Sequence, residues 1–296
     1  MSTPEAAMQQ PEAPAELAGG AFEFVQALAG ELSTGELELP GFPEIVVRVR
    51  RVLADEDSSA ETVARVIGSE PVLAAQLLQT ANSAALNPGG KPLVELRAAV
   101  MRVGLNVVRS TTLAFAVRQL RNSAALRGLE RPLELLWQRS VLTASLCFVI
   151  ARRFRISPDA ALLTGLLQGI GRLYILTRAS RHRALFADVA SYQAIERDWH
   201  LSIAVAILEH WGMAEEIVQA VRDCEDYARE PRGAVSLSDV LLAATLVAVY
   251  QEQPELLEAR LQSVRPVARL NLDRAACQRL LEESAEEIAA LQSALG

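Results

Sequence analysis

The chain is poor in aromatic residues, cysteines and histidines, and each scarcity limits the kind of core, cross-link or metal site that the protein can form. Aromatic residues make up 5% of the 296 residues, so Leu, Val, Ile and Ala must build the core. The three cysteines, Cys147, Cys224 and Cys277, stand far apart and form no CxxC pair. A sparse, odd set of this kind favours a reducing cytoplasm over a disulfide framework. The three histidines offer few ligands for a metal site.

The chain also lacks a basic excess and a long apolar run. Its 29 basic and 36 acidic side chains give a net charge of −7, which weighs against direct nucleic-acid binding because phosphate contacts need a basic surface. The longest apolar runs, Val141–Ala151 and Val240–Tyr250, are about half the roughly 20 residues that cross a bilayer. The N-terminus has no basic region followed by an apolar one. We therefore expect a cytoplasmic protein without a membrane span.

Hydrophobic residues make up 51% of the chain, and they recur at helical spacing along most of it. Ser157-Pro158 is typical of a cap followed by a first-turn proline, and Pro71 starts another helix in the same way. We find no alternating β-branched run long enough for a sheet, so the sequence predicts an all-α fold. In the first half, Ser58 and Glu61 predict a capping box, one helix is expected from Pro92 to Gly104, and Asn106 is expected to cap the next. In the second half we expect separate helices over Arg181–Asp198 and Ser202–Trp211, and a helical tail over Arg274–Leu295.

Breaks in this pattern divide the chain into four parts. Residues 1–21 are rich in Ala, Glu, Pro and Gln and are predicted to be disordered. A polar break at Arg121–Arg131 separates two helical subdomains, which we place at residues 22–125 and 126–251. Residues 252–296 are expected to form a C-terminal helical extension.

Six motifs, in order and with consistent spacing, closely resemble the HDOD family, the HD-related output domain of bacterial signalling proteins. The resemblance covers about Leu39–Glu225. Its motifs are LPGFPEI (Leu39–Ile45), SEPVLAAQLLQTANSA (Ser69–Ala84), AAVMRVGL (Ala98–Leu105), WQRSVLTAS (Trp137–Ser145), TGLLQGIGR (Thr164–Arg172) and ERDWHLSIAVAILEHWGM (Glu196–Met213).

The resemblance implies two packed helical subdomains, of which the second is a degenerate HD-like bundle. HD-type metal phosphohydrolases hold their metal with His and Asp side chains from several helices, and those ligands lower the pKa of a bound water. At the corresponding positions this chain has other residues or a lone histidine. The degenerate positions are Ser140, Gln168, Gly169, His200, Cys224 and Glu225.

These replacements are poor metal ligands, because glycine has no side chain and an amide is a weak, uncharged donor. We expect His200 to be structural or exposed, and His182 and His210 to lie on the surface. Acidic neighbours should raise the pKa of the Cys224 thiol and make it a poor nucleophile. GLLQGIGR is followed by no Lys-Ser/Thr pair, so it is not a phosphate-binding loop. We expect no catalytic residue, no metal and no cofactor.

Three functions fit these observations. The first is a non-catalytic module that recognises signalling proteins, including those of two-component or cyclic-di-GMP pathways, as the resemblance implies. The second is a divergent phosphohydrolase, or a cyclic-dinucleotide-binding protein, that uses the degenerate cleft. The third is a helical scaffold that regulates transcription through a protein partner or DNA. The oligomeric state stays open.

A partner surface is expected in the first subdomain or on the C-terminal tail. Arg48 and Arg51 belong to a basic bias there that could meet an acidic partner, although a solvated helix face is the simpler interpretation. Asn82 and Ser83 could contact a partner as well. The alternative is that they cap the transition from a helix to a loop.

Overall fold

The computed structural model describes residues 15–34, 43–55, 57–123, 126–182, 185–186 and 188–295, with only the backbone described for 15–20. In these ranges the regular structure is helical and no strand occurs. The prediction of an all-α fold is therefore confirmed. The helices of the first half are α1 (Ala15–Thr34), α2 (Glu44–Ala54), α3 (Ala60–Gly68), α4 (Pro71–Ala81) and α5 (Leu96–Arg121).

The second half continues with further helices, several of which are deeply buried. These are α6 (Glu130–Ala151), α7 (Pro158–Leu167), α8 (Ile170–Ala179), α10 (Val189–His210), α11 (Glu215–Arg222) and α12 (Leu237–Tyr250). The C-terminal extension adds α13 (Pro254–Ser263), α14 (Arg265–Ala268), α15 (Arg274–Glu283) and α16 (Ala285–Leu295).

Local caps explain where several helices begin. Ser157 accepts a hydrogen bond from the amide of Ala160 at 3.2 Å, and Pro158 occupies the first turn of α7 as predicted. At the start of α3 the prediction was one residue off. Ser59, not Ser58, accepts from the amide of Thr62, because Ser58 bonds to Asp55 instead.

Other boundaries differ because tertiary packing outweighs local signals. The helix expected from Pro92 begins at Leu96, and α5 continues through Gly104, whose φ of 73° produces a kink where a stop was predicted. Two helices were expected over 181–198 and 202–211, but a single helix, α10, spans most of this stretch. The tail expected as one helix over 274–295 divides at Ser284 into α15 and α16.

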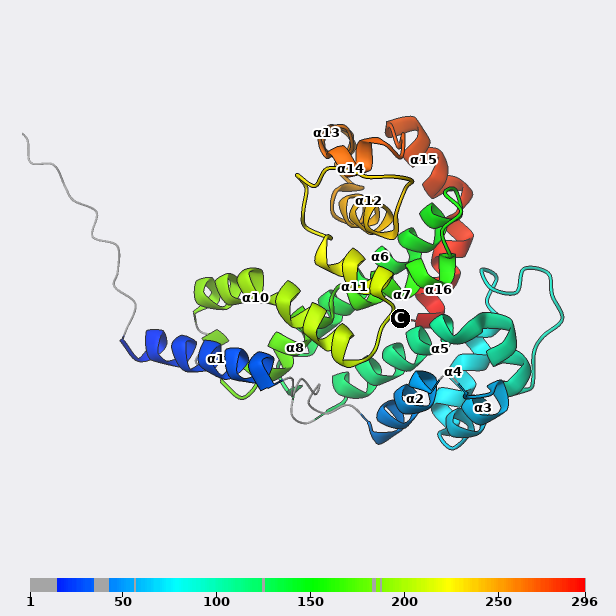
Figure 1. Ribbon diagram of the computed structural model, residues 1–296, viewed down its shortest axis with the longest axis horizontal. Coiled ribbons are helices and arrows are strands. Elements are labelled where there is room, and N and C mark those ends of the chain that lie inside the picture. Colours follow the sequence, from blue (N-terminus) through cyan, green and yellow to red (C-terminus); the bar gives the residue numbers. More distant parts are fainter. Residues whose placement is uncertain are drawn as a thin grey trace, which may run out of the picture.

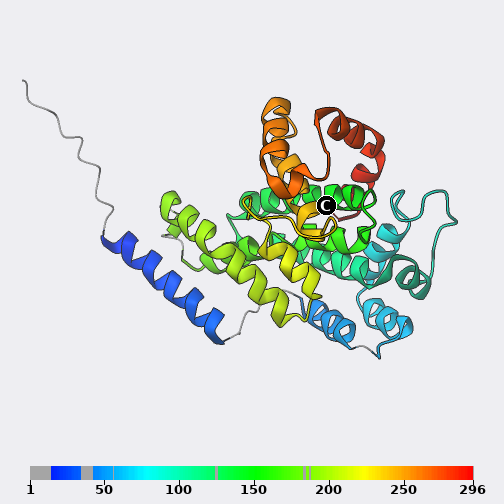
Figure 2. The ribbon, with the colours of Figure 1, turned by 45° about the horizontal axis from the view of Figure 1, so that its top comes forward.

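The helices form an elongated body (Figures 1 and 2). Helix α1 lies at one end of it, beside α10, whereas α16 lies near the middle, beside α5. Helices α2, α3 and α4 gather at one end against α5, while α13 to α15 cluster near α12, which packs on α6. The long helix α6 and the shorter α7 pack together in the middle, and α5 packs across them. Helix α10 pairs with α8 and extends away from the body.

Helix α1 does not pack where the domain prediction placed it. It begins at Ala15, so residues 15–21 of the segment predicted to be disordered are helical, and residues 1–14 lie outside the described part. Although assigned to the first subdomain, it packs against α10. Phe24 and Leu28 are buried, and Glu31 pairs with Arg178 of α8 at 2.7 Å. The apolar face of α1 thus finds its complement in the second half.

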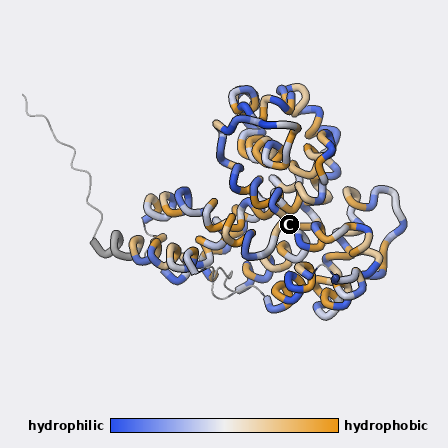
Figure 3. Tube along the Cα trace, in the orientation of Figure 1, coloured by the Kyte–Doolittle hydropathy of each residue, from blue (hydrophilic) through white to orange (hydrophobic). Residues whose placement is uncertain are grey.

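Hydrophobic residues alternate with hydrophilic ones along most helices, as amphipathic packing requires (Figure 3). Three described helical stretches are long and apolar enough to cross a membrane by length and composition: Leu96–Arg121, Glu130–Ala151 and Pro158–Ala179. Of their most apolar windows, 67%, 67% and 94% are buried inside the fold. Packing against other helices accounts for that apolarity, and the expected absence of a membrane span stays a prediction.

Candidate functional site

Two of the degenerate positions, Ser140 of α6 and Gly169 at the α7–α8 junction, face each other at close range. A Cβ atom built on Gly169 would lie 2.5 Å from the Ser140 Oγ, which already donates to the carbonyl oxygen of Leu136 at 3.1 Å. Gln168, the neighbouring position, is buried with 6% of its surface exposed. A larger side chain at position 169 would therefore require Ser140 to move.

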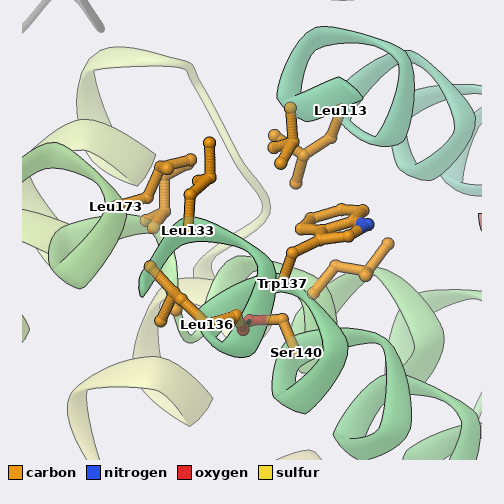
Figure 4. Close-up of a pocket in the computed structure, with 10 residues that line it drawn as sticks. Leu113, Leu133, Leu136, Trp137, Ser140 and Leu173 are labelled. Atoms are coloured by element: carbon orange, nitrogen blue, oxygen red, sulfur yellow. Dashed lines mark hydrogen bonds between the residues drawn. The ribbon is translucent and has the colours of Figure 1, made fainter. Parts of the chain in front are cut away.

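The space beside these two residues is apolar. A small pocket, with room for about one water molecule, lies between α5, α6 and the α7–α8 junction. Six of its residues surround the space in Figure 4, and five of those are Leu or Trp. These six are Leu113, Leu133, Leu136, Trp137, Ser140 and Leu173. The hydroxyl of Ser140 is used within its own helix, so this pocket offers no set of converging polar groups.

A second group of residues assembles around Arg172 of α8. Its Nη2 lies 2.7 Å from Glu225 Oε1 and 3.0 Å from His200 Nε2, and its Nε lies 3.7 Å from Glu196 Oε1. His200 is fully buried, and its Nε2 lies 3.3 Å from the same Glu225 oxygen. A guanidinium cation thus faces two carboxylates and a buried imidazole across α8, α10 and the end of α11.

The hydrogen bonds of His200 involve one ring nitrogen. Among the described residues its Nδ1 is buried without a hydrogen-bond partner. Its Nε2 can accept from Arg172 Nη2 or, when it carries the proton, donate to the Glu225 carboxylate. The expectation of a structural histidine agrees with this burial. His210 is exposed as expected, whereas His182 is half-buried and its ring meets Phe24 edge-on, which corrects its expected surface position.

The electrostatics of this group favour a charged carboxylate and an inert thiol. Hydrogen bonds from His200 and Arg172 outweigh desolvation and lower the pKa of Glu225 from 4.5 to about 2. Burial, assisted by the Glu225 charge, raises the pKa of the Cys224 thiol to about 12. The direction predicted for Cys224 is therefore correct, but burial contributes more than its acidic neighbours.

Four of the six degenerate positions have contacts that define two groups of neighbours. Ser140 and Gly169 border the apolar pocket, whereas His200 and Glu225 meet Arg172. Arg172 and Glu196 were missed as site residues, although both lie within motifs that carry the family resemblance. Within the described ranges no group of three or more His, Cys, Asp or Glu side chains is arranged to hold a metal ion.

The predicted partner residues divide between exposed and internal positions. Arg48 and Arg51 are exposed on α2, where Arg48 also donates to the Ser69 hydroxyl. Asn82 is used internally, because its amide accepts from the Leu93 amide at 2.7 Å and donates to the Leu93 carbonyl at 2.8 Å. The Oγ atom of Ser83 is buried. These contacts favour the capping alternative for Asn82 and leave the two arginines as the exposed candidates.

The family model of the HDOD domain matches residues 39–227. The chain belongs to the HDOD family. The match ends two residues past Glu225, so every degenerate position lies inside the HDOD domain, while α12 to α16 lie beyond it.

Several solved structures are similar in fold to this HDOD protein. One, from Shewanella amazonensis SB2B, has a name that proposes a metal-dependent phosphohydrolase; it is 25% identical, covers 94% of this chain and 100% of its own, and has a TM-score of 0.73. An HDOD domain protein of unknown function from Geobacter sulfurreducens is 21% identical, with coverages of 93% and 98% and a TM-score of 0.57. A protein from Marinobacter aquaeolei VT8, which its name proposes to act in signal transduction, is 18% identical, with coverages of 94% and 65% and a TM-score of 0.54. No curated protein matches the sequence.

Proposed function

We propose that this HDOD protein is a non-catalytic regulatory module of bacterial signal transduction that acts in the cytoplasm by recognising other proteins. The observation that carries the proposal is the use of the degenerate HD positions for packing and internal charge pairing. Gly169 and Ser140 are in close apposition, and Arg172 already neutralises the carboxylate of Glu225. A divalent cation at the Glu225 Oε1 atom would have to compete with the guanidinium of Arg172.

The reactive groups near these positions also support the proposal. Hydrolysis needs an activated water or a nucleophile. The raised pKa of Cys224 keeps its sulfur protonated near neutral pH. Ser140 is 3% exposed, and its Oγ already donates to the Leu136 carbonyl rather than to a base. With the internal positions occupied, recognition falls to the surface, where we place Arg48 and Arg51 as contacts for an acidic partner.

A divergent phosphohydrolase or cyclic-dinucleotide-binding protein is the second candidate. The observation in its favour is the name of the Shewanella amazonensis relative, together with an arginine of suitable charge for a phosphate. Two carboxylates lie within salt-bridge distance of that arginine, which works against an incoming anion. For this reason we place this candidate second.

Elemental analysis combined with turnover assays separates the two candidates. We expect purified protein to hold no stoichiometric iron, manganese or zinc, and to show no turnover of nucleotides or cyclic dinucleotides. About one tightly bound metal per chain, lost in His200→Ala but kept in the exposed control His210→Ala, would overturn the proposal. Saturable binding of a cyclic dinucleotide that is lost in Arg172→Gln would favour the second candidate instead.

A further inference from the structure

Glu225 lies in the turn that follows α11, close to the point where the HDOD match ends. Its carboxylate faces Arg172 of α8 and His200 of α10. The amide of Asp226 donates to the carbonyl oxygen of Asp223 at 3.0 Å, which closes the turn with Glu225 inside it. Because such a turn fixes its central residues, the position of Glu225 depends on what holds the two sides of the turn.

Buried polar side chains of α12 hold both sides. Before Glu225, the carboxylate of Asp223 accepts a hydrogen bond from the Ser238 hydroxyl at 2.9 Å. After Glu225, Arg229 donates to the carboxylate of Asp239, and its Nε lies 3.7 Å from Asp223 Oδ2. Ser238 and Asp239 are 6% and 1% exposed, so water competes little for these contacts.

Asp239 also connects this turn to the C-terminal extension. Its Oδ2 accepts from the amide of Ser236 at 2.9 Å in the capping box that begins α12. Arg269, which follows α14, has its Nη1 3.8 Å from the same oxygen and donates from Nη2 to the carbonyl oxygen of Gly233. A buried carboxylate is costly unless it is paired, and here Arg229 and Arg269 both face it. The loss of this carboxylate would deprive both arginines of a buried partner.

A second contact between the same segments is of a different kind. Glu230 pairs with Arg265 of α14, but their side chains are 64% and 70% exposed. Exposed pairs of this type contribute little to holding a structure together. The connection between the extension and the turn therefore depends on Asp239, and Glu230 provides a matched control.

We propose that α12, through Ser238 and Asp239, holds Glu225 against Arg172, so that the C-terminal extension controls the geometry of the degenerate HD site. Ser238 and Asp239 are thus positioning residues. An event that moves α12 or α14 would change the pairing of Glu225, and a change at Glu225 would act back on the extension, because such coupling is reciprocal. Both helices lie beyond the HDOD match, so this control comes from outside the family domain.

The test measures the ionisation of Glu225 by carbon NMR on the full chain with labelled glutamate carboxyl groups, and Glu225→Gln assigns the signal. In wild type, hydrogen bonds from His200 and Arg172 lower the pKa of Glu225 from 4.5 to about 2, so the carboxylate is ionised at pH 4. Loss of positioning weakens those hydrogen bonds and raises the pKa again.

Asp239→Asn distinguishes positioning from charge by the direction of the change. Asparagine keeps an oxygen for the Ser236 amide but no longer pairs with the arginines as an ion. The removal of a negative charge would, by itself, lower the pKa of Glu225 further. We expect the opposite, an increase of at least about one pH unit, with Glu225 partly protonated at pH 4.

Two further variants complete the comparison. Ser238→Ala changes no charge and removes the donor to Asp223, so we expect a smaller increase, of roughly half a pH unit. Glu230→Gln removes an exposed negative charge from the same segment and should leave the titration of Glu225 as in wild type.

An unchanged or lowered pKa of Glu225 in folded Asp239→Asn would overturn the inference, and so would an unchanged pKa in Ser238→Ala. An increase in Glu230→Gln as large as that in Asp239→Asn would show that the buried contacts have no special role. If Asp239→Asn does not fold, Ser238→Ala decides alone. None of these results depends on metal content, turnover or partner capture, so they are independent of the test of the proposed function.

Discussion

The contacts of Arg172 show how a single residue changes the chemistry available to a fold. Its guanidinium lies within hydrogen-bond distance of His200 and Glu225, so a fixed cation of the chain neutralises the Glu225 carboxylate. A guanidinium cannot lower the pKa of a bound water as a divalent metal does. The arrangement therefore suits structural support better than hydrolysis.

The stability of this group should depend on pH in a defined range. The folded state lowers the pKa of Glu225 from 4.5 to about 2, so the contribution is fully present above pH 4.5 and is lost as the pH falls toward 2. Glu225→Gln should remove that contribution. With allowance for its partial exposure, it should lower the free energy of unfolding near neutral pH by about 1 kcal/mol.

Urea unfolding at several pH values checks this expectation. The difference between wild type and Glu225→Gln should shrink between pH 4.5 and 2, where the wild-type carboxylate becomes protonated. Glu216→Gln, on the exposed side of α11, serves as the control and should follow wild type. A constant difference at all pH values would show that the pairing does not contribute as described.

The sequence identified which positions belong to this site, but not which side chains contact one another there. Motif spacing located Gln168, Gly169 and His200, because these positions are defined along the chain. Arg172 stands four residues past Gln168 and was not singled out. Its role depends on contacts with residues 196, 200 and 225, which only the relative orientation of α8, α10 and α11 brings together.

At the scale of elements, glycines set how closely α8 approaches α10. A Cβ atom on Gly171 would overlap the carbonyl oxygen of His200, a backbone atom that cannot rotate away. The closeness of this approach also places Arg172 beside His200. The glycine therefore supports the site through packing and not through backbone freedom.

A single methyl group at Gly171 should consequently be costly. We expect Gly171→Ala to lower the free energy of unfolding by about 3 kcal/mol, because α8 and α10 must separate. Gly30→Ala is the matched control: no neighbouring atom lies within 4 Å of its added Cβ, and the helix should gain up to about 1 kcal/mol. Chemical denaturation of both variants measures the difference. Equal stabilities would mean that the two helices are not packed as closely as described.

Helix boundaries were predictable where the signal was local. Helix α4 begins at Pro71, as the first-turn proline predicts, and the apolar run Val240–Tyr250 lies within α12. At Asp198 and Ser202 the polar residues suggested a break, yet α10 continues because its buried face, including His200 and Ile203, packs on α8. Such continuity comes from tertiary contacts that local sequence does not contain.

At the scale of the whole molecule, the all-α architecture and the family followed from periodicity and motif order. The sequence did not predict where the first and last described helices, α1 and α16, pack. Helix α1 packs on α10, and α16 packs between the two halves, although neither contact joins neighbours in sequence. Amphipathic helices indicate that a face is buried but not which surface buries it.

The central claim is that function lies in recognition surfaces and not in the degenerate cleft. Its most direct test is quantitative capture of partner proteins from a bacterium that naturally produces the protein, identified by mass spectrometry. The variants are Gln168→Ala in the cleft and the double reversal of Arg48 and Arg51 to Glu on α2. All proteins must first match the wild type in helical content and unfolding midpoint, as exposed charges contribute little to stability.

We predict that the double reversal reduces capture of the specific partner by about tenfold or more, and that Gln168→Ala captures it as well as wild type. The opposite result, in which folded Gln168→Ala loses the partner while the reversed arginines retain it, would make the cleft the working site and contradict this account.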